Sequence, residues 1–272
     1  MNNVTQTALL YRIERFYDAV PRTAADAEPH GPLTLFVRRG PGWPYYARPT
    51  LGAAAPDVNG ILAVRGRQRE LGVPEEFEWV DEVTPGLAPA AFDAGLAVRR
   101  CPLMVLDPGR MVLPSVPPGF VLRFLDPSGP GAGELSAAID AVGSVAFSGR
   151  GGGPAERDAA TGVTPLGGSA LARLESGALV RAAIADNTGE DLGVLCSGGY
   201  QRAGDVAEIV GVATLPSHQR LGLGGALTAA LASHALDAGC ELVFLSAGSD
   251  DIARIYARLG FTQIATACLA AP

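Results

Sequence analysis

A glycine-rich stretch between an apolar run and a helical pattern carries the clearest chemistry in this chain. It reads QRLGLGGAL over residues 219–227, with glycines at positions 222, 224 and 225. Glycine lets backbone N–H groups approach a ligand that side chains would keep away. The donors of such a turn continue into the start of a helix, where the macrodipole favours anions. The stretch therefore predicts a phosphate-binding turn.

The spacing of the turn fits the pattern Q/R-x-x-G-x-G/A, and the region resembles the GNAT superfamily of acetyl-coenzyme A-dependent N-acetyltransferases. A dinucleotide-binding turn is disfavoured, because the third glycine of G-x-G-x-x-G would fall at Leu227. The resemblance implies acetyl-coenzyme A as acetyl donor, with no metal. It also implies pyrophosphate contacts at Gln219, Arg220, Leu221, Gly222, Leu223, Gly224, Gly225 and Ala226.

A strand is expected immediately before the turn. Within it, Gly211 is costly for an ordinary strand and suits a bulge or a close backbone approach. In the superfamily this strand separates from its neighbour at a bulge, and its exposed backbone pairs with the pantetheine arm. The resemblance thus implies that the Val212 N–H binds the acetyl carbonyl and that the backbone of Ala213 and Thr214 contacts the pantetheine.

Two side chains match catalytic positions of the superfamily. Glu208 lies 11 residues before Gln219 in a run, Ala-Glu-Ile-Val, that is similar to the catalytic strand of histone acetyltransferases, which implies a general base. Tyr256 matches the segment Y-x-x-x-G-F, which implies a general acid for the departing thiolate. The alternatives are a solvent-facing or ion-paired Glu208 and a Tyr256 that only packs against the sheet.

Fewer residues can be assigned around the rest of the site. Family members often carry asparagine near the start of the helix that contains Tyr256, whereas this chain has Ser-Asp-Asp over residues 249–251. Ser246 or Ser249 is therefore expected to make the pantetheine contact instead. Phe147 and Tyr200 are candidates for the wall of the acceptor site.

The elements expected downstream of a proline- and glycine-rich linker at 108–119 follow the superfamily order β-α-α-β-β-β-α-β-α-β. This order predicts an α/β (α+β) GNAT fold with a mixed, mostly antiparallel sheet flanked by helices. Residues 149–165 are expected to form a loop. It is either a mobile segment that faces the substrate or a surface loop with no role in function. The expected strands cover 120–125, 178–185, 192–200, 205–215, 242–245 and 261–269, and the helices cover 134–147, 166–174, 222–238 and 250–259.

The N-terminal part repeats an order of elements, β-α-β-α-β, that matches the second half of the GNAT pattern. We expect a smaller degenerate GNAT-like domain over residues 1–115 and the acetyltransferase domain over 116–272. The loop at 50–57 has no Q/R-x-x-G-x-G, so the first domain should not bind cofactor. Its role is then structural or dimerising, or it covers the substrate cleft. The repeated elements are expected at 44–49, 58–71, 77–81, 87–96 and 98–106.

Composition excludes several classes of protein. With 272 residues, 48% hydrophobic and 18% charged, the chain is expected to fold, and it lacks an apolar run long enough for a membrane span. The net charge of −7 is spread along the sequence. A basic stripe of the kind that binds nucleic acid is absent, so a nucleic-acid partner is not expected. The start of the chain shows no secretory signal, so a cytoplasmic location is expected. The four scattered cysteines, expected to be small buried hydrophobes, are Cys101, Cys196, Cys240 and Cys268.

Together these features predict an N-acetyltransferase that acts on a primary amine by direct attack, a small molecule rather than a protein. A homodimer is compatible with the sequence. The competing hypothesis is a catalytically silent acyl-coenzyme A-binding module with a regulatory role. The presence of both Glu208 and Tyr256 favours the enzyme.

Overall fold

The computed structural model describes residues 3–40, 44–162 and 166–272. The chain divides into two compact units. Unit 1 comprises the residues up to Met104 together with Ser246–Ala253 and Gln263–Pro272, and unit 2 comprises Val105–Leu245 and Arg254–Thr262. The domain boundary expected near residue 116 falls within unit 2, since the chain enters that unit at Val105.

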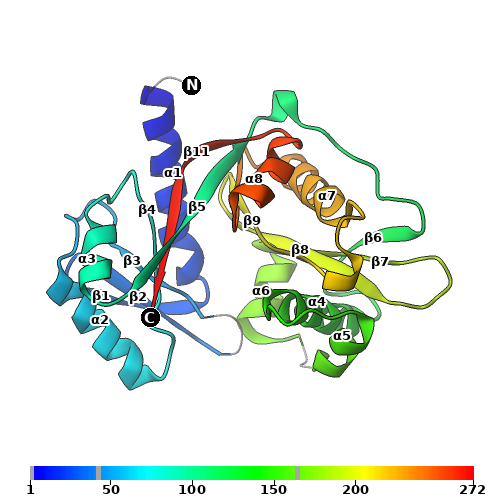
Figure 1. Ribbon diagram of the computed structural model, residues 1–272, viewed down its shortest axis with the longest axis horizontal. Coiled ribbons are helices and arrows are strands. Elements are labelled where there is room, and N and C mark those ends of the chain that lie inside the picture. The colour runs from blue at the N-terminus through cyan, green and yellow to red at the C-terminus, as the bar shows by residue number, and fades with distance from the viewer. Residues whose placement is uncertain (1–2, 41–43, 163–165) are drawn as a thin grey trace. The chain divides into compact units, whose positions relative to one another are not determined.

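The strands of unit 1 follow the order β1-β2-β3-β4-β11-β5 (Figure 1). The last strand of the chain is placed between β4 and β5 and runs antiparallel to β4, with Cys268 opposite Trp79. The C-terminus therefore completes the sheet that the N-terminal half begins. The elements are α1 (Asn3–Arg22), β1 (Ala25–His30), β2 (Leu33–Arg38), β3 (Ala47–Pro49), α2 (Val58–Leu71), β4 (Phe77–Val80), α3 (Leu87–Asp93), β5 (Ala97–Leu106) and β11 (Phe261–Ala271).

The two faces of the unit 1 sheet differ in chemistry. Phe77 and Trp79 point to one face and share an apolar core with Ile61 of α2. The residue between them, Glu78, points to the other face, where it pairs with Arg48. The Arg48 guanidinium lies 3.8 Å from the ring centroid of Tyr17 in α1. Helix α1 thus covers a face that contains buried charges.

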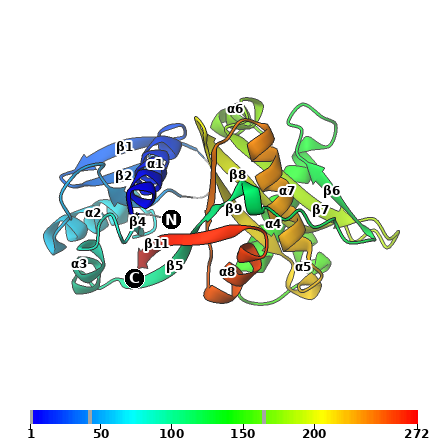
Figure 2. The ribbon, with the colours of Figure 1, turned by 90° about the horizontal axis from the view of Figure 1, so that it is seen from above.

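Unit 2 contains a sheet of order β10-β9-β8-β7-β6 with helices on both faces (Figures 1 and 2). Strands β6 to β9 are antiparallel, and β9 pairs in parallel with β10. The predicted mixed, mostly antiparallel sheet is confirmed. Its elements, with α8, are β6 (Phe120–Phe124), α4 (Ala132–Phe147), α5 (Pro154–Ala160), α6 (Gly168–Glu175), β7 (Leu179–Asp186), β8 (Val194–Ala203), β9 (Val206–Thr214), α7 (Leu223–Asp237), β10 (Leu242–Ser246) and α8 (Asp250–Ala257), with short 3-10 helices at Pro108–Arg110 (η1) and Pro216–His218 (η2).

Hydrogen bonds identify the helix on each face of the unit 2 sheet. The Ser197 hydroxyl of β8 donates to the Ile139 carbonyl of α4 at 3.1 Å. On the opposite face, the Tyr200 hydroxyl lies 2.9 Å from Nδ1 of His234 in α7. Tyr200 is only 1% exposed, so its predicted place in the acceptor wall is wrong, because its ring fills the core beneath α7.

Several elements differ from the sequence predictions. The loop predicted over 149–165 contains α5, and its residues 163–165 lie outside the described part of the chain. Helix α1 and the strands β1 and β2 were not predicted. All four cysteines are buried and free, as predicted. Within the described ranges, every helix is too short or too polar to cross a bilayer.

Candidate cofactor and catalytic site

The parallel strands β9 and β10 separate part-way along β9. Their pairing covers Val206 to Glu208 on β9 and ends with Glu208 opposite Phe244. Strand β9 continues to Thr214, whereas β10 ends at Ser246. The backbone of β9 beyond Glu208 therefore faces the opening between the two strands, where an extended ligand can pair with it like an added strand.

A bulge in β9 lies beside this opening. Ser197 of β8 is opposite Ala213 and Gly199 is opposite Val210, so two residues of β9 face the single residue between them on β8. One of the two is Gly211, whose φ of +63° is a left-handed conformation that favours glycine. The bulge predicted at Gly211 is confirmed.

The turn after β9 has the backbone of an anion-binding loop. Arg220 has a φ of +63°, which is uncommon for a residue other than glycine, and Gly222 has a φ of +83°. Gly222 is the N-cap of α7, and no side chain caps this helix. Alternating left-handed residues turn successive N–H groups toward one side, and an uncapped N-terminus leaves its donors available. The predicted phosphate turn therefore has suitable geometry.

The fold itself does not explain two glycines in the first turn of α7. A Cβ at Gly225 would have no neighbour within 4 Å, and one at Gly224 would make only an ordinary contact with Thr214 at 3.5 Å. Neither Gly224 nor Gly225 has a positive φ, so neither needs glycine for its backbone conformation. Glycine inside a helix costs about 1 kcal/mol relative to alanine. A ligand that approaches the backbone closely would account for this cost.

Glu208 lies on the α4 and α6 face of the sheet. Its partner across β8 is Gln201, and directly opposed residues of antiparallel strands share a face. Gln201 accepts a hydrogen bond of 2.6 Å from Nη2 of Arg173 in α6. Glu208 is 8% exposed and stands at the point where β9 and β10 separate. The position suits a base that serves an acceptor on this face.

Tyr256 lies on the opposite face, next to α7. Burial raises the pKa of Tyr256 to about 12, and its side chain forms a hydrogen bond with that of Thr228. Thr228 is fully buried in α7 and donates its hydroxyl proton to the Gly224 carbonyl at 2.8 Å. Tyr256 is therefore protonated at neutral pH, as an acid must be, and Thr228 links it to the phosphate turn.

Cys196 is the thiol near this group. Burial raises its pKa to about 11, and its sulfur accepts a hydrogen bond of 3.3 Å from the Thr214 hydroxyl. The thiol is neutral at physiological pH, so it is a poor nucleophile.

The described residues hold no group of three or more His, Cys, Asp or Glu side chains that could bind a metal.

Unit 2 brings together most of the predicted site: Glu208, Val212, Ala213, Thr214, residues 219–226 and Tyr256. Ser246 and Ser249 belong to unit 1. The Ser249 hydroxyl accepts a hydrogen bond of 3.3 Å from the Ile252 N–H at the start of α8, so it has a capping role there. Phe147 is 65% exposed at the end of α4. The ligand contacts of all the predicted site residues stay predictions.

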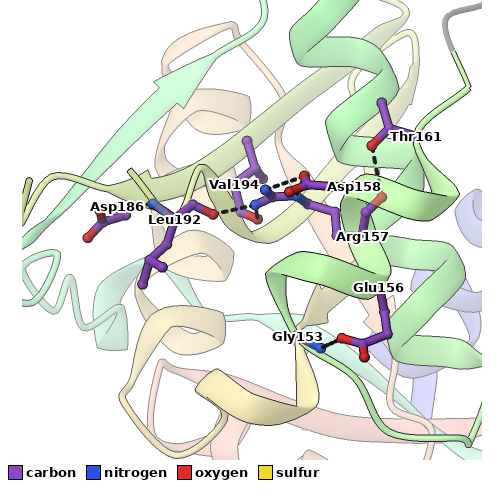
Figure 3. Close-up of polar contacts among 8 residues, drawn as sticks. All are labelled: Gly153, Glu156, Arg157, Asp158, Thr161, Asp186, Leu192 and Val194. Carbon is purple, nitrogen blue, oxygen red and sulfur yellow. Dashed lines mark hydrogen bonds and ion pairs between the residues drawn. The ribbon is translucent and has the colours of Figure 1, made fainter. Parts of the chain in front are cut away.

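Sequence reasoning missed two buried polar residues of unit 2. Thr228 is the polar residue in an otherwise apolar part of α7, and that contrast was the available signal. Arg157 is 6% exposed in α5 and binds the carbonyl groups of Leu192, in the β7–β8 connection, and of Val194, at the start of β8 (Figure 3). Its importance depends on contacts between residues far apart in sequence, which no local pattern encodes.

Comparison with known proteins identifies the domain that contains this site. Residues 164–261 match the model of the acetyltransferase (GNAT) family. These residues form a GNAT acetyltransferase domain. A search of curated protein sequences found no match. The phosphate turn, the bulge and Tyr256 of the GNAT domain all lie within the matched range.

Solved structures extend the likeness in fold to both units. A GCN5-related N-acetyltransferase from Kribbella flavida matches 97% of this chain over 95% of its own, with a TM-score of 0.72 and 24% identity. A GCN5-related N-acetyltransferase-like protein from Streptococcus suis matches 98% of this chain and 99% of its own, with a TM-score of 0.57 and 13% sequence identity. A tandem GNAT protein from the clavulanic acid biosynthesis pathway matches 88% of this chain and 78% of its own, with a TM-score of 0.54 and 16% sequence identity. These likenesses confirm the predicted GNAT fold and agree with two GNAT-like halves.

Proposed function

We propose that the GNAT domain transfers an acetyl group from acetyl-coenzyme A to a primary amine. The observation that carries this proposal is the uncapped N-terminus of α7, with two glycines that the fold does not require. Backbone donors in this arrangement suit a pyrophosphate. The separated edge of β9 leads from this turn toward Glu208, and it offers the pantetheine arm a strand to pair with.

The proposed reaction uses one residue on each face of the sheet. Glu208 removes a proton from the ammonium group, directly or through a water molecule, and the free amine then attacks the thioester carbonyl carbon. The Val212 N–H at the bulge stabilises the negative charge that develops on the carbonyl oxygen. When the C–S bond breaks, the Tyr256 hydroxyl gives its proton to the thiolate. The nitrogen of the tetrahedral intermediate releases its second proton to water, and Tyr256 takes a proton back from water. The products are an amide and free coenzyme A.

The acceptor is proposed to be a small cationic amine. The protein carries a formal net charge of −7, which weakly favours the approach of a cation. Glu208 on the α4 and α6 face provides a carboxylate for the ammonium group before it loses its proton. A cytoplasmic location is proposed with it, because acetyl-coenzyme A is supplied inside cells.

Release of free thiol from acetyl-coenzyme A tests the proposal. Binding of coenzyme A is first measured by calorimetry, and thiol release is then followed against a panel of small amines and amine-bearing peptides. We expect binding and amine-dependent release that Glu208→Gln reduces. Tight binding without release from any amine, and without an effect of Glu208→Gln, would instead identify a silent acyl-coenzyme A-binding module. Absence of binding would overturn both functions.

A further inference from the structure

We propose that the segment 152–160, which contains α5, is a strap that holds the phosphate turn in its binding conformation. In this proposal, Gly152 and Gly153 contact the residues that lead into the turn, and Arg157 is a positioning residue that fixes the strap. The inference rests on the proposed function, because it assumes that the turn binds the pyrophosphate of coenzyme A.

Arg157 attaches the strap to the sheet (Figure 3). Its Nη1 donates to the carbonyl oxygens of Leu192 and Val194, both at 2.6 Å. Its Nε and Nη2 donate to the Asp158 carboxylate at 3.0 and 2.5 Å. The planar guanidinium therefore spans two carbonyls and one carboxylate, a geometry that a lysine could not reproduce.

The β7–β8 connection is shaped to receive this guanidinium. Gly193 lies between the two carbonyls and has a φ of +65°. A Cβ at this position would come within 2.9 Å of both terminal nitrogens of Arg157. Gly193 thus meets two demands at once, a left-handed backbone and a close approach by the arginine. This fit indicates a specific attachment and not a chance surface contact.

The other end of the strap touches the residue that leads into the turn. The Ser217 N–H donates to the Gly152 carbonyl at 3.1 Å. Gly153 packs so closely that an added Cβ would lie 2.7 Å from the Ser217 hydroxyl oxygen. Gly153 also donates its N–H to the Glu156 carboxylate at 2.7 Å, which fixes the start of α5. Ser217 lies two residues before Gln219, the first residue of the phosphate turn.

The sheet and the strap together restrain the entry to the turn. The Leu215 N–H donates to the Leu195 carbonyl of β8 at 2.9 Å, and the strap holds Ser217 two residues later. Arg157 joins the strap to Val194, the neighbour of Leu195. These contacts form a closed loop of attachments around residues 215–217. Preorganised backbone donors bind an anion more tightly, because less ordering is needed on binding.

The proposal predicts an effect on the phosphate end of the donor and not on the acetyl transfer itself. Weakening the strap should raise the Kd for coenzyme A and the KM for acetyl-coenzyme A, while kcat changes little. Acetyl-pantetheine has no pyrophosphate, so its kcat/KM should not change. This contrast separates a positioned turn from a general loss of structure, which would affect both donors.

The first test is a pair of variants at the contact between the strap and the turn. Gly153→Ala should push on Ser217 and raise the Kd for coenzyme A about tenfold, since small misplacements of binding groups are costly. Ser217→Ala in the same chain removes the oxygen at 2.7 Å and should restore the affinity. An unchanged Kd in Gly153→Ala, or no rescue in the double variant, would overturn the proposal.

The second test removes the attachment. Arg157→Met should raise the Kd for coenzyme A, whereas Arg181→Met should not. Arg181 is a suitable control, because it is also largely buried in unit 2 and pairs with Asp140 and Ser136, away from the turn. Equal Kd values for both variants and the wild type would contradict the role of Arg157. If the wild-type protein itself does not bind coenzyme A, the proposed function fails and not the strap alone.

Discussion

Helices α2 and α7 have equivalent positions in their units, but their N-termini are capped differently. Each comes after a strand that pairs in parallel with the next strand, β3 with β4 in unit 1 and β9 with β10 in unit 2. In α2 the N-cap is Asp57, whose carboxylate accepts a hydrogen bond of 2.8 Å from the Gly60 N–H. In α7 the N-cap is Gly222, with no side chain to accept one. Helix α2 thus has a carboxylate of the chain at its N-terminus, whereas no side chain caps the N-terminus of α7.

The buried carboxylates of the two units show the same contrast. Glu78 pairs with Arg48 within unit 1, and burial raises its pKa. Glu14, from α1, approaches the same arginine, and burial raises its pKa as well. Glu208 of unit 2 lies where two strands separate. The carboxylates of Glu14 and Glu78 thus lie beside a buried arginine within the fold, whereas Glu208 borders the opening between β9 and β10.

The largest expected effect separates the two kinds of carboxylate. Glu208→Gln should lower kcat/KM for acetyl transfer about 100-fold or more, because it removes the general base. Glu78→Gln should leave kcat/KM nearly unchanged and reduce the free energy of unfolding, since the buried Arg48 loses its ion pair with Glu78. Steady-state kinetics and urea denaturation of both variants measure this. Equal activity losses in the two variants would remove the distinction.

Loss of the proposed acid should have the next largest effect. Tyr256→Phe should lower kcat by about 100-fold at neutral pH, with little change in the Kd for coenzyme A. Because burial raises the pKa of Tyr256 to about 12, the wild-type enzyme should show no loss of activity from deprotonation of this group up to about pH 10. Initial rates across the pH range test this point. A full rate in the phenylalanine variant would exclude an acid role.

The difference between the two helix ends can be reversed by one substitution. Gly222→Asp gives α7 the carboxylate that α2 has in Asp57, and it should raise the Kd for coenzyme A about tenfold by repelling the pyrophosphate. Gly222→Asn is the matched control, because both side chains bear the same strain at a φ of +83°. Calorimetric titration of both variants at one salt concentration makes the comparison. Equal affinities would mean that charge at this N-terminus does not matter.

The buried charges of unit 1 should make stability depend on pH. Burial raises the pKa of Glu14 above its ordinary value of 4.5, so the folded state holds this proton more tightly than the unfolded state does. Its contribution to stability is therefore present below about pH 4.5 and is lost as the pH rises through the folded-state pKa. Glu14→Gln should raise the free energy of unfolding near pH 8, because the variant buries no charge at this position. Urea denaturation at pH 5 and pH 8 tests this, and a destabilised variant at pH 8 would contradict it.

The smallest expected effect concerns the N-terminus of α2, which Asp57 caps. Asp57→Ala should reduce the free energy of unfolding by about 1 kcal/mol, because the Gly60 N–H loses its capping partner. It should not change the Kd for coenzyme A, since unit 1 is not proposed to bind it. Thermal unfolding and calorimetry on the same preparation give both values. A changed Kd would show that the first helix end also takes part in binding.

Local patterns in the sequence predicted the elements that carry the site. The glycines at 222, 224 and 225 located the turn, and Gly211 located the bulge. Helix α2 was predicted with its observed bounds, and in the structure Asp57 caps its start and Gly72 ends it. These features depend on the conformational needs of single residues, which a sequence displays directly.

The remaining features depend on contacts between distant residues. Strand β11 completes the sheet of unit 1, and no pattern within 261–271 identifies β4 as its neighbour. Helix α5 has only seven residues and is fixed by the bonds of Arg157 and Glu156. Helix α1 was detectable, because Leu10, Ile13 and Tyr17 follow helical spacing on its buried face.

A crystal structure of the complex with coenzyme A tests the central claim most directly. The uncapped N-terminus of α7 should hold the pyrophosphate, with phosphate oxygens within hydrogen-bonding distance of the N–H groups of Leu223, Gly224 and Gly225. The pantetheine should run along the backbone of β9 beyond Glu208. Pyrophosphate bound elsewhere, or held by side chains alone with no contact to these N–H groups, would contradict the account.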